Sequence, residues 1–247
     1  MMLWLRSAAF LAFSFLSILV FALFALLVFW APQSFLWNIV VTYCKLALWA
    51  GEFFCGMKVV VEGRENLPAT GSCVLVCNHT SHLDTLCLLS AVALRRIHHC
   101  FPAAAADYFF TSLPRSAVSA ILINALPFDR KAGGAQSLDL CSRLLQEEGN
   151  ILILFPEGTR TTTGAIGRFR SGIGRLAAGT DLDIVPCHLE GGMRAWPKGK
   201  LLPRPRRLRL RIGHAKNFGH LDTTAESVKA VCTDLQRCVT QLGGNRP

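Results

Sequence analysis

Charged residues are scarce in this 247-residue chain: only 17% are Asp, Glu, Lys or Arg, whereas 51% are hydrophobic. Together with a mean hydropathy of +0.37, this composition is too apolar for an ordinary soluble enzyme. Acidic residues are scarcer than basic ones, 16 against 26, so the formal net charge is +10. A chain that is both basic and apolar favours an anionic membrane surface as its partner.

The sequence also lacks the patterns that accompany several kinds of chemistry. It has no zinc finger, no RNA-binding signature and no interleaving of aromatic with basic residues, so nucleic-acid binding is not predicted. It has no G-x-x-x-x-G-K-[ST] phosphate loop and no G-x-S-x-G nucleophile elbow. We therefore expect neither P-loop nucleotide binding nor an acyl-enzyme formed on such a serine.

Cysteine is plentiful, with ten residues, but no two form a C-x-x-C pair and most lie inside apolar runs. They behave as small buried hydrophobes rather than as a disulfide framework, which indicates a reducing, cytoplasm-facing compartment. The sequence His98-His99-Cys100 suggests a metal site at first sight, but adjacent side chains point apart and no second ligand cluster accompanies them. No metal site is predicted.

The long run without charge lies near the start of the chain, at residues 7–30. A helix of that length, rising 1.5 Å per residue, would be about 36 Å long, enough to cross a hydrocarbon core of roughly 30 Å. A signal peptide is the competing interpretation. Its apolar core is normally about 7 to 15 residues long, however, and no small-residue cleavage site precedes Pro32. Membrane anchoring is the better interpretation.

A second helix is predicted from about Phe35 to Phe54, with its polar residues on one face. These are Asn38, Thr42, Lys45 and Glu52. Such a helix lies at the membrane interface or half immersed, in a hairpin with the first, and a second spanning helix is the alternative. Residues 1–57 then form a hydrophobic two-helix membrane anchor before a domain over residues 58–247. The basic residues of that domain favour the cytoplasmic side, which is the inner membrane in a bacterium.

Two polar loops follow apolar runs, and the first carries a histidine and a carboxylate. Residues 73–77 are an unbroken apolar run, which is typical of a strand covered on both faces. His79 and Asp84 follow at the strand end, where open α/β sheets bind ligands. A neutral imidazole oriented by a carboxylate is the usual general base near neutral pH, although a lone His–Asp pair is more often not catalytic.

The second loop, Phe155-Pro156-Glu157-Gly158-Thr159-Arg160, follows the apolar run of residues 151–154. It brings an acid, a glycine, a hydroxyl and an arginine into four consecutive positions. Glycine permits close backbone approach, and the guanidinium fork of arginine suits phosphate or carboxylate. The alternative is an ordinary strand-to-loop turn with a surface salt bridge.

Together the two loops resemble those of the glycerolipid acyltransferases. His79 and Asp84 match that family's His-four-residues-Asp motif, and residues 155–160 match its Phe-Pro-Glu-Gly-Thr-Arg motif without a substitution. Two weaker blocks occur in the family's order: Pro127-Phe128-Asp129-Arg130 between the two motifs, and Ile184-Val185-Pro186 after them. Four blocks in order make the resemblance strong, and it covers roughly residues 58–215.

The resemblance implies an O-acyltransferase of phospholipid biosynthesis. The donor would be acyl-CoA or acyl carrier protein, and the acceptor a lysophospholipid, with 1-acyl-sn-glycerol-3-phosphate going to phosphatidic acid as the best match. His79 would remove the hydroxyl proton, while Asp84 would orient His79 and stabilise its imidazolium form. The acyl donor is a co-substrate, and neither a further cofactor nor a metal is implied. His82 also lies in the first motif, but the family spacing selects His79.

The substrate-binding residues that the resemblance implies are Arg130, Glu157, Gly158, Thr159 and Arg160. The two arginines would hold the acceptor phosphate through charge-assisted hydrogen bonds. Glu157 would bind the glycerol hydroxyls or order the loop. Three alternatives remain open at this point: an acyltransferase for another lysophospholipid or lyso-aminolipid, a lipid hydrolase, and a non-catalytic membrane adaptor on the same fold.

The alternation of strands and helices predicts an α/β fold, with a mixed, mostly buried sheet flanked by helices. Strands are expected at residues 58–62, 73–77, 101–106, 151–154 and 183–189, and around 208–212, where apolar residues alternate with arginines. Helices are expected from Asp84 to about Leu94, from Gly133 to about Glu148, near 173–178 and over 223–242.

Overall fold

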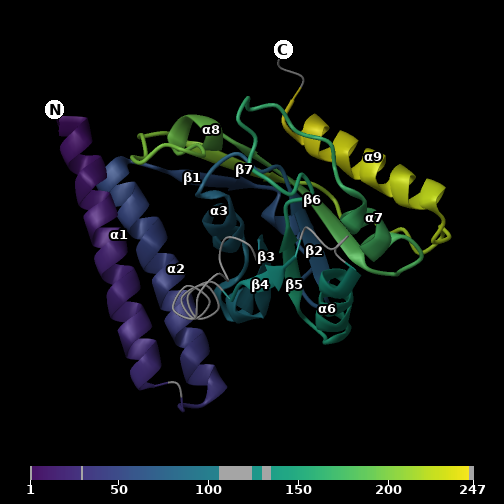
Figure 1. The fold of residues 1–247 in the computed structure, drawn as a ribbon, viewed down its shortest axis with the longest axis horizontal. Helices are drawn as coiled ribbons and strands as arrows, with labels where there is room; N and C mark the ends of the chain where they lie inside the picture. The colour runs from purple at the N-terminus through teal and green to yellow at the C-terminus, as the bar shows by residue number, and fades with distance from the viewer. Residues whose placement is uncertain (1, 29, 106–123, 130–134, 245–247) are drawn as a thin grey trace.

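A seven-stranded sheet forms the centre of the molecule (Figure 1). The computed structural model describes residues 2–28, 30–105, 124–129 and 135–244. The strand order is β1-β7-β6-β2-β5-β3-β4, and all neighbouring strands are parallel except β6 and β7, which are antiparallel. The strands are β1 Val59–Glu62, β2 Cys73–Cys77, β3 Cys100–Ala105, β4 Leu126–Phe128, β5 Ile151–Leu154, β6 Asp183–Glu190 and β7 Leu208–Ile212.

Helices cover both faces of this sheet. The α-helices are α1 Met2–Leu27, α2 Gln33–Cys55, α3 Asp84–Ala91, α6 Ala135–Gln146, α7 Ser171–Ala177, α8 Gly192–Ala195 and α9 Ala225–Leu242. Two 3₁₀ helices, η1 Arg64–Asn66 and η2 Leu94–His99, complete the described elements. The expected α/β fold with a mixed sheet flanked by helices is confirmed.

The central strand β2 is buried on both sides, which explains its unbroken apolar sequence. Because side chains alternate along a strand, Cys73, Leu75 and Cys77 pack in one core with α2 and α3. Val74 and Val76 point the other way and pack in a second core with α6, α7 and α9. The carboxyl end of β2 therefore lies at a rigid, doubly covered edge of the sheet.

The predicted elements differ from the observed ones mainly at their ends. The strands at residues 73–77 and 151–154 have the predicted bounds. The helix that begins at Asp84 ends at Ala91, earlier than predicted, because Val92 is extended and a 3₁₀ helix follows. The short elements β4 and α8 were not predicted. Strand β4 holds Pro127 at the edge of the sheet, where a missing backbone N–H is tolerated.

Helices α1 and α2 form a hairpin along one side of the molecule (Figure 1). Helix α1 begins at Met2 rather than Ser7, so it includes the charged Arg6. Arg6 donates from Nε to the carbonyl of Phe54 (2.8 Å) and from Nη2 to that of Phe53 (3.3 Å). These carbonyls lie at the C-terminal end of α2, where a cation is favoured. This contact lets a charged residue join the apolar helix.

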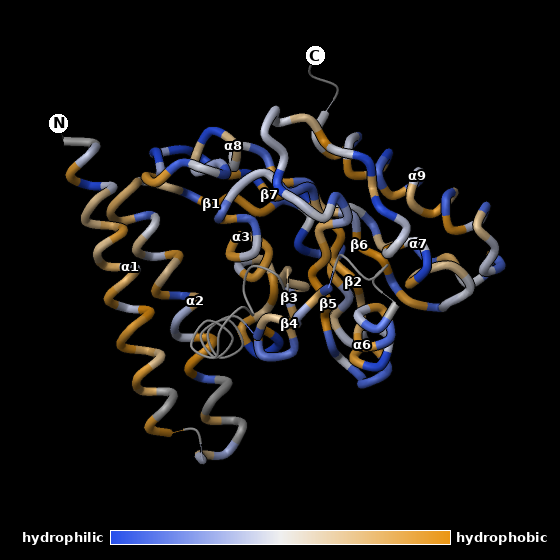
Figure 2. The backbone as a smooth tube through the Cα atoms, in the orientation of Figure 1, coloured by the Kyte–Doolittle hydropathy of each residue, from blue (hydrophilic) through white to orange (hydrophobic). Residues whose placement is uncertain are grey.

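The two helices of the hairpin differ in their surroundings. Residues Trp4–Phe24 of α1 are long and apolar enough to cross a membrane and are little buried by the protein, and Figure 2 shows the hydrophobic residues along them. Within the described part of the chain, no other helix meets that test. Helix α2 contributes Val40 and Cys44 to the core that contains Leu75, and α1 contributes Phe10 to the same core. The division into an anchor over 1–57 and a domain over 58–247 stays a prediction.

Candidate active site

The first polar loop begins at Asn78, just after β2. There the side chain of Asn78, rather than its backbone, forms hydrogen bonds with the neighbouring strand β6. The Nδ2 of Asn78 donates to the carbonyl of Leu189 in β6 (3.1 Å), and the N–H of Leu189 donates to Oδ1 of Asn78 (2.8 Å). The buried backbone groups of Leu189 thus keep partners although β2 has ended. Asn78 is itself 3% exposed, so the loop that carries His79 starts from a fixed point in the core.

Asp84, the first residue of α3, is fully buried and held by four protein donors. The backbone N–H groups of Thr80 (2.7 Å) and Ser81 (2.9 Å) donate to its Oδ2, and the Ser81 hydroxyl donates to its Oδ1. His79 Nδ1 lies 2.7 Å from Oδ2. Because a carboxylate only accepts, we assign the proton of the neutral imidazole to Nδ1. The basic nitrogen of His79 is then Nε2.

The ring of His79 stacks on Phe155, the first residue of the second motif. The two ring centroids are 4.1 Å apart, and the ring planes differ by 16°. The stack fixes the plane of the imidazole ring, and the bond to Asp84 fixes how the ring is turned within that plane. The His79 side chain remains 22% exposed, so a substrate can reach it.

Glu157 joins the two motifs through its carboxylate. Its Oε1 accepts from the backbone N–H of His79, and its Oε2 accepts from that of Gly167, both at 2.7 Å. In return, the N–H of Thr161 donates to the carbonyl of His79 (2.9 Å). Burial raises the pKa of the Glu157 carboxyl, and the two backbone bonds oppose that rise. Since both oxygens bind within the protein, the geometry favours loop ordering over contact with glycerol hydroxyls.

Gly158 occupies a position that other residues cannot take without strain. Its φ is +72°, and a Cβ there would lie 2.7 Å from Nε of Arg170. The same Nε donates to the carbonyl of Glu157 (3.2 Å) and so braces the turn. The next residue, Thr159, is exposed. Thr159 is therefore open to solvent, while Arg170 holds the backbone of the turn in place.

Arg160 lies against His82, which comes from the first motif. Nη1 of Arg160 is 2.5 Å from Nδ1 and 3.0 Å from Nε2 of His82. The His82 ring lies 5.1 Å from the ring of Trp196, and its backbone N–H donates to the Trp196 carbonyl (3.1 Å). Partial burial of the ring, and then the charge of Arg160, lower the pKa of His82 to about 4. The imidazole of His82 is therefore neutral near pH 7.

Gly192, at the start of α8, closes the site from the side of β6. A Cβ at Gly192 would meet the hydroxyl of Thr80 and would lie 2.9 Å from Ser81 Oγ and 3.2 Å from Asp84 Oδ1. No larger residue fits beside the groups that hold Asp84. Sequence reasoning missed this contact. The available signal was a Gly-Gly pair directly after a buried strand.

Comparison with known proteins identifies the family. A model of the family described as Acyltransferase matches residues 58–190, more than half of the chain. The chain belongs to the acyltransferase family. The expected resemblance to the glycerolipid acyltransferases is confirmed, because relatives of this chain carry the names of such enzymes.

Several relatives carry the name 1-acyl-sn-glycerol-3-phosphate acyltransferase. The chloroplastic LPAT1 of Arabidopsis thaliana is 28% identical over 198 residues, which cover 78% of this chain and 52% of that protein. The relative from Bacillus subtilis is 29% identical over 187 residues, which cover 74% of this chain and 87% of that protein. The chain spans about half the length of two of the plant relatives, 52% of the Arabidopsis protein and 43% of one from Brassica napus.

A solved structure shares the fold. The crystal structure of the 1-acyl-sn-glycerophosphate acyltransferase PlsC from Thermotoga maritima matches with a TM-score of 0.74 at 20% sequence identity. The match covers 99% of this chain and 98% of that one. It therefore includes the helical hairpin as well as the sheet.

In this chain, most of the residues expected at the site lie together in the loops that follow β2 and β5. His79, Asp84, Glu157, Gly158 and Arg160 lie within the network of contacts described above. Thr159 lies next to it, on the exposed side of the loop. Arg130 lies outside the described residues. The block Ile184-Val185-Pro186 belongs to β6 and lies in the sheet beside β2 rather than at the site.

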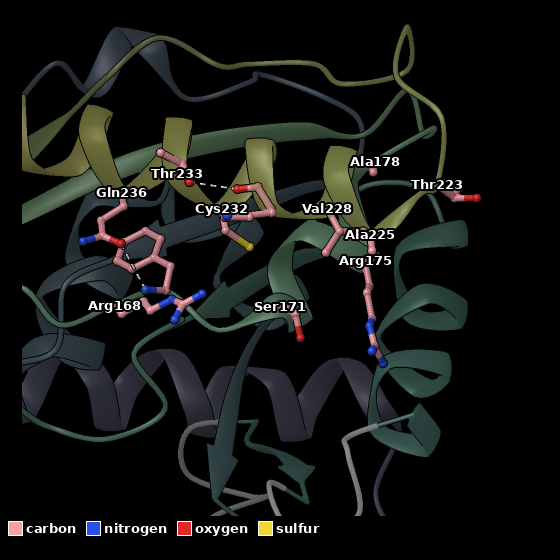
Figure 3. Close-up of a pocket in the computed structure, with 12 residues that line it drawn as sticks. Arg168, Ser171, Arg175, Ala178, Thr223, Ala225, Val228, Cys232, Thr233 and Gln236 are labelled. Carbon is pink, nitrogen blue, oxygen red and sulfur yellow. Dashed lines mark hydrogen bonds between the residues drawn. The ribbon is translucent and has the colours of Figure 1, made fainter.

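A cavity of about 690 Å³ lies elsewhere, between α7 and α9 (Figure 3). Basic side chains line it, among them Arg168, Arg175 and Lys229, but neither His79 nor Asp84 does. The cavity is therefore separate from the His79 site. Over the described ranges, no group of three or more His, Cys, Asp or Glu side chains is placed to hold a metal ion.

Proposed function

We propose that this acyltransferase moves a fatty acyl group from a thioester donor to the free hydroxyl of 1-acyl-sn-glycerol-3-phosphate, giving phosphatidic acid. One observation carries the proposal. The His79–Asp84 pair, at 2.7 Å, is bound through Glu157 to the loop that presents Arg160. A base and an anion-binding side chain thus share one site. The names of the relatives support the choice of acceptor.

In the proposed reaction, Nε2 of His79 takes the proton of the acceptor hydroxyl while that oxygen bonds to the thioester carbonyl carbon. The tetrahedral intermediate then breaks its carbon–sulfur bond, and the imidazolium returns the proton to the departing sulfur. Asp84 holds the reactive tautomer and stabilises the imidazolium, as in a Ser-His-Asp triad. The substrate alcohol takes the place of the serine, so no covalent enzyme intermediate forms.

Arg160 is proposed to hold the acceptor phosphate through charge-assisted hydrogen bonds, with Arg130 as a second cation. Thr159 offers a hydroxyl from the exposed side of the same loop, and Gly158 lets the backbone approach the ligand closely. The acyl donor is acyl-CoA or acyl carrier protein that is loaded with a fatty acyl group. Each of them brings the acyl group as a thioester, whose reaction with an alcohol requires no further cofactor.

The proposed location is a membrane surface, with the site facing the cytoplasm. Helix α1 supplies an apolar segment of spanning length, and the net charge of +10 attracts anionic lipids. All ten cysteines are free, which fits a reducing compartment. In a bacterium the membrane would be the inner one.

The test uses membranes from cells that express the wild-type chain or His79→Ala. Each preparation receives a panel of lysolipids with acyl-CoA or acyl-loaded carrier protein, and diacyl product is counted. We expect phosphatidic acid from lysophosphatidate, reduced on the order of 10²- to 10⁴-fold in the variant because the general base is lost. Product with another lysolipid alone would change the acceptor. Donor-independent release of fatty acid would indicate a hydrolase, and an unimpaired variant would overturn the mechanism.

A further inference from the structure

In the contact between Arg160 and His82, only the guanidinium can be the donor. A guanidinium does not lose its proton in a protein, so Arg160 donates and the imidazole nitrogen accepts. At 2.5 Å between Nη1 and Nδ1, this is a close, charge-assisted contact. His82 is therefore neutral in the free protein, and its ring lies against the guanidinium that is proposed to receive the acceptor phosphate.

We propose that His82 is a second ligand of that phosphate and selects a phosphomonoester dianion over a phosphodiester. The arriving phosphate displaces the Arg160 guanidinium from the imidazole and enters between the two groups. The freed ring then takes up a proton from solvent and donates a hydrogen bond to the same phosphate. This inference rests on the proposed function, in which Arg160 binds the acceptor phosphate.

His82 stays within reach of the phosphate after displacement because its own position is fixed independently of Arg160. Its backbone N–H is bound to the Trp196 carbonyl at 3.1 Å, and its ring lies against the Trp196 indole. Residues 81 and 197 also form an antiparallel bridge beside it. Only the side chain of Arg160 must shift for an anion to enter between the two groups. His82 is exposed, so the anion can approach from solvent.

The charged groups around His82 explain why it would respond to a dianion. Arg160 and His79 lower the pKa of His82, in addition to the effect of burial, while Asp84 raises it. A bound phosphate would add two negative charges next to the ring and offset the charge of Arg160, which raises the pKa of His82 toward or above neutrality. Proton uptake on binding follows by linkage.

The charge balance gives the pair its selectivity. A phosphomonoester carries two negative charges above about pH 7, which match one guanidinium and one imidazolium. A phosphodiester carries a single negative charge, which Arg160 alone can balance, so it gains little from protonation of His82. Lysophosphatidate belongs to the first class, and lysophosphatidylglycerol to the second.

The experiment compares His82→Phe with the full-length wild-type chain in detergent micelles. His82→Phe keeps an aromatic ring against Trp196 but can neither accept nor donate a hydrogen bond. We expect its KM for lysophosphatidate to rise on the order of tenfold or more at pH 7.5, with kcat changed less than threefold. We expect KM for any lysophosphatidylglycerol turnover to stay within about twofold, because that acceptor needs only Arg160.

The pH dependence separates a phosphate ligand from a packing residue. Between pH 7.5 and 9 the substrate phosphate stays dianionic, so the wild-type KM for lysophosphatidate should rise as His82 in the complex loses its proton. His82→Phe should show a flat profile. His82→Asn, which donates but does not titrate, should recover part of the affinity with the same flat profile. The exposed histidine variant His214→Phe is the matched control and should behave as wild type.

Two results would overturn the inference while leaving the proposed function intact. One is an active His82→Phe enzyme with the wild-type KM and pH profile. The other is an equal rise in KM for both acceptor classes together with a lower melting temperature, which would mark His82 as a packing residue only. A wild-type chain that makes no donor-dependent product would instead refute the proposed function.

Discussion

At the scale of single residues, two buried carboxylates organise the site in different ways. Asp84 holds the imidazole of His79 and is held by backbone N–H groups of its own loop. Glu157 touches no reacting group in this arrangement and instead binds the backbone of both motifs. In the proposed mechanism Asp84 therefore belongs to the chemistry and Glu157 is a positioning residue.

The variant Glu157→Gln tests that positioning role. A glutamine would place its NH₂ group opposite the N–H of either His79 or Gly167, leaving a buried donor without a partner. We expect the free energy of unfolding to fall by about 1–3 kcal/mol. We also expect kcat to fall by about 10- to 100-fold, because His79 would shift from its productive position. Chemical denaturation and initial rates on the same preparation measure both effects.

The matched control is Glu65→Gln, since Glu65 is exposed and lies outside the site. It should leave the free energy of unfolding within about 0.5 kcal/mol of the wild type and kcat unchanged. If Glu157→Gln raised only KM for the acceptor, with kcat and stability intact, Glu157 would be a substrate ligand instead.

At the scale of elements, the contact between β6 and α9 depends on a histidine. Nδ1 of His188 in β6 lies 3.0 Å from the carbonyl of Val239 in α9. Gly243, just after α9, packs so closely that a Cβ there would lie 2.7 Å from Cε1 of the His188 ring. Burial lowers the pKa of His188, so the folded protein keeps this ring neutral where the unfolded chain would protonate it.

This shift predicts a loss of stability in acid. Because the folded pKa of His188 is below its unfolded value of about 6.5, the unfolded chain binds more protons in that range. The contribution of His188 is thus fully present above about pH 6.5 and is lost as the pH falls below it. His188→Gln keeps a donor for Val239 but does not titrate, so its free energy of unfolding should change less between pH 7.5 and pH 5 than that of the wild type.

Chemical denaturation of the two proteins in detergent at both pH values measures the difference. His214→Gln, at an exposed position, serves as the control and should keep the wild-type difference. Equal differences for wild type and His188→Gln would contradict the assignment of this pH dependence to the contact between β6 and α9.

At the scale of the whole molecule, helix α1 is joined to the segment that supports the candidate phosphate site. The Ser7 hydroxyl donates to the carbonyl of Pro203 (2.7 Å), and the Phe10 ring lies 5.9 Å from that of Trp196 in an edge-on contact. Trp196 in turn contacts His82. The position of α1 and that of the site are thus linked by packed side chains.

The exposed side chains of α1 should determine membrane retention. Leu16 and Leu23 are 61% and 53% exposed and lie two turns apart on one face. An arginine at the centre of a bilayer costs about 2.5–3.5 kcal/mol by insertion scales. The double variant Leu16→Arg/Leu23→Arg should therefore leave the membrane pellet after an alkaline carbonate wash, whereas the wild type stays in it.

The same variant should keep its melting temperature in detergent within about 2 °C, because neither leucine packs in the core. Leu140→Arg is the matched control, since Leu140 on α6 is 41% exposed but far along the chain from the hairpin. It should remain in the pellet. Retention of the double variant would show that α1 does not hold the chain on the membrane.

The sequence predicted the strands and loops around His79, Asp84 and residues 155–160 because those signals are local. An unbroken apolar run followed by a polar cluster predicts a buried strand and the loop at its end. Gly192 and Trp196 were missed, since their importance depends on contacts with residues more than 100 positions earlier in the chain. No periodicity within α8 indicates that it lies beside Asp84.

The sequence by itself determined the apolar helix, the buried strands, the His79–Asp84 pair and the family motifs, because each follows from short-range patterns of side chains. Only the tertiary structure decided that α2 joins the core, that Glu157 binds the backbone of both motifs and that His82 lies against Arg160. These features depend on which surfaces meet when the sheet assembles. Burial and hydrogen bonding between distant segments select those contacts, and a linear pattern does not encode them.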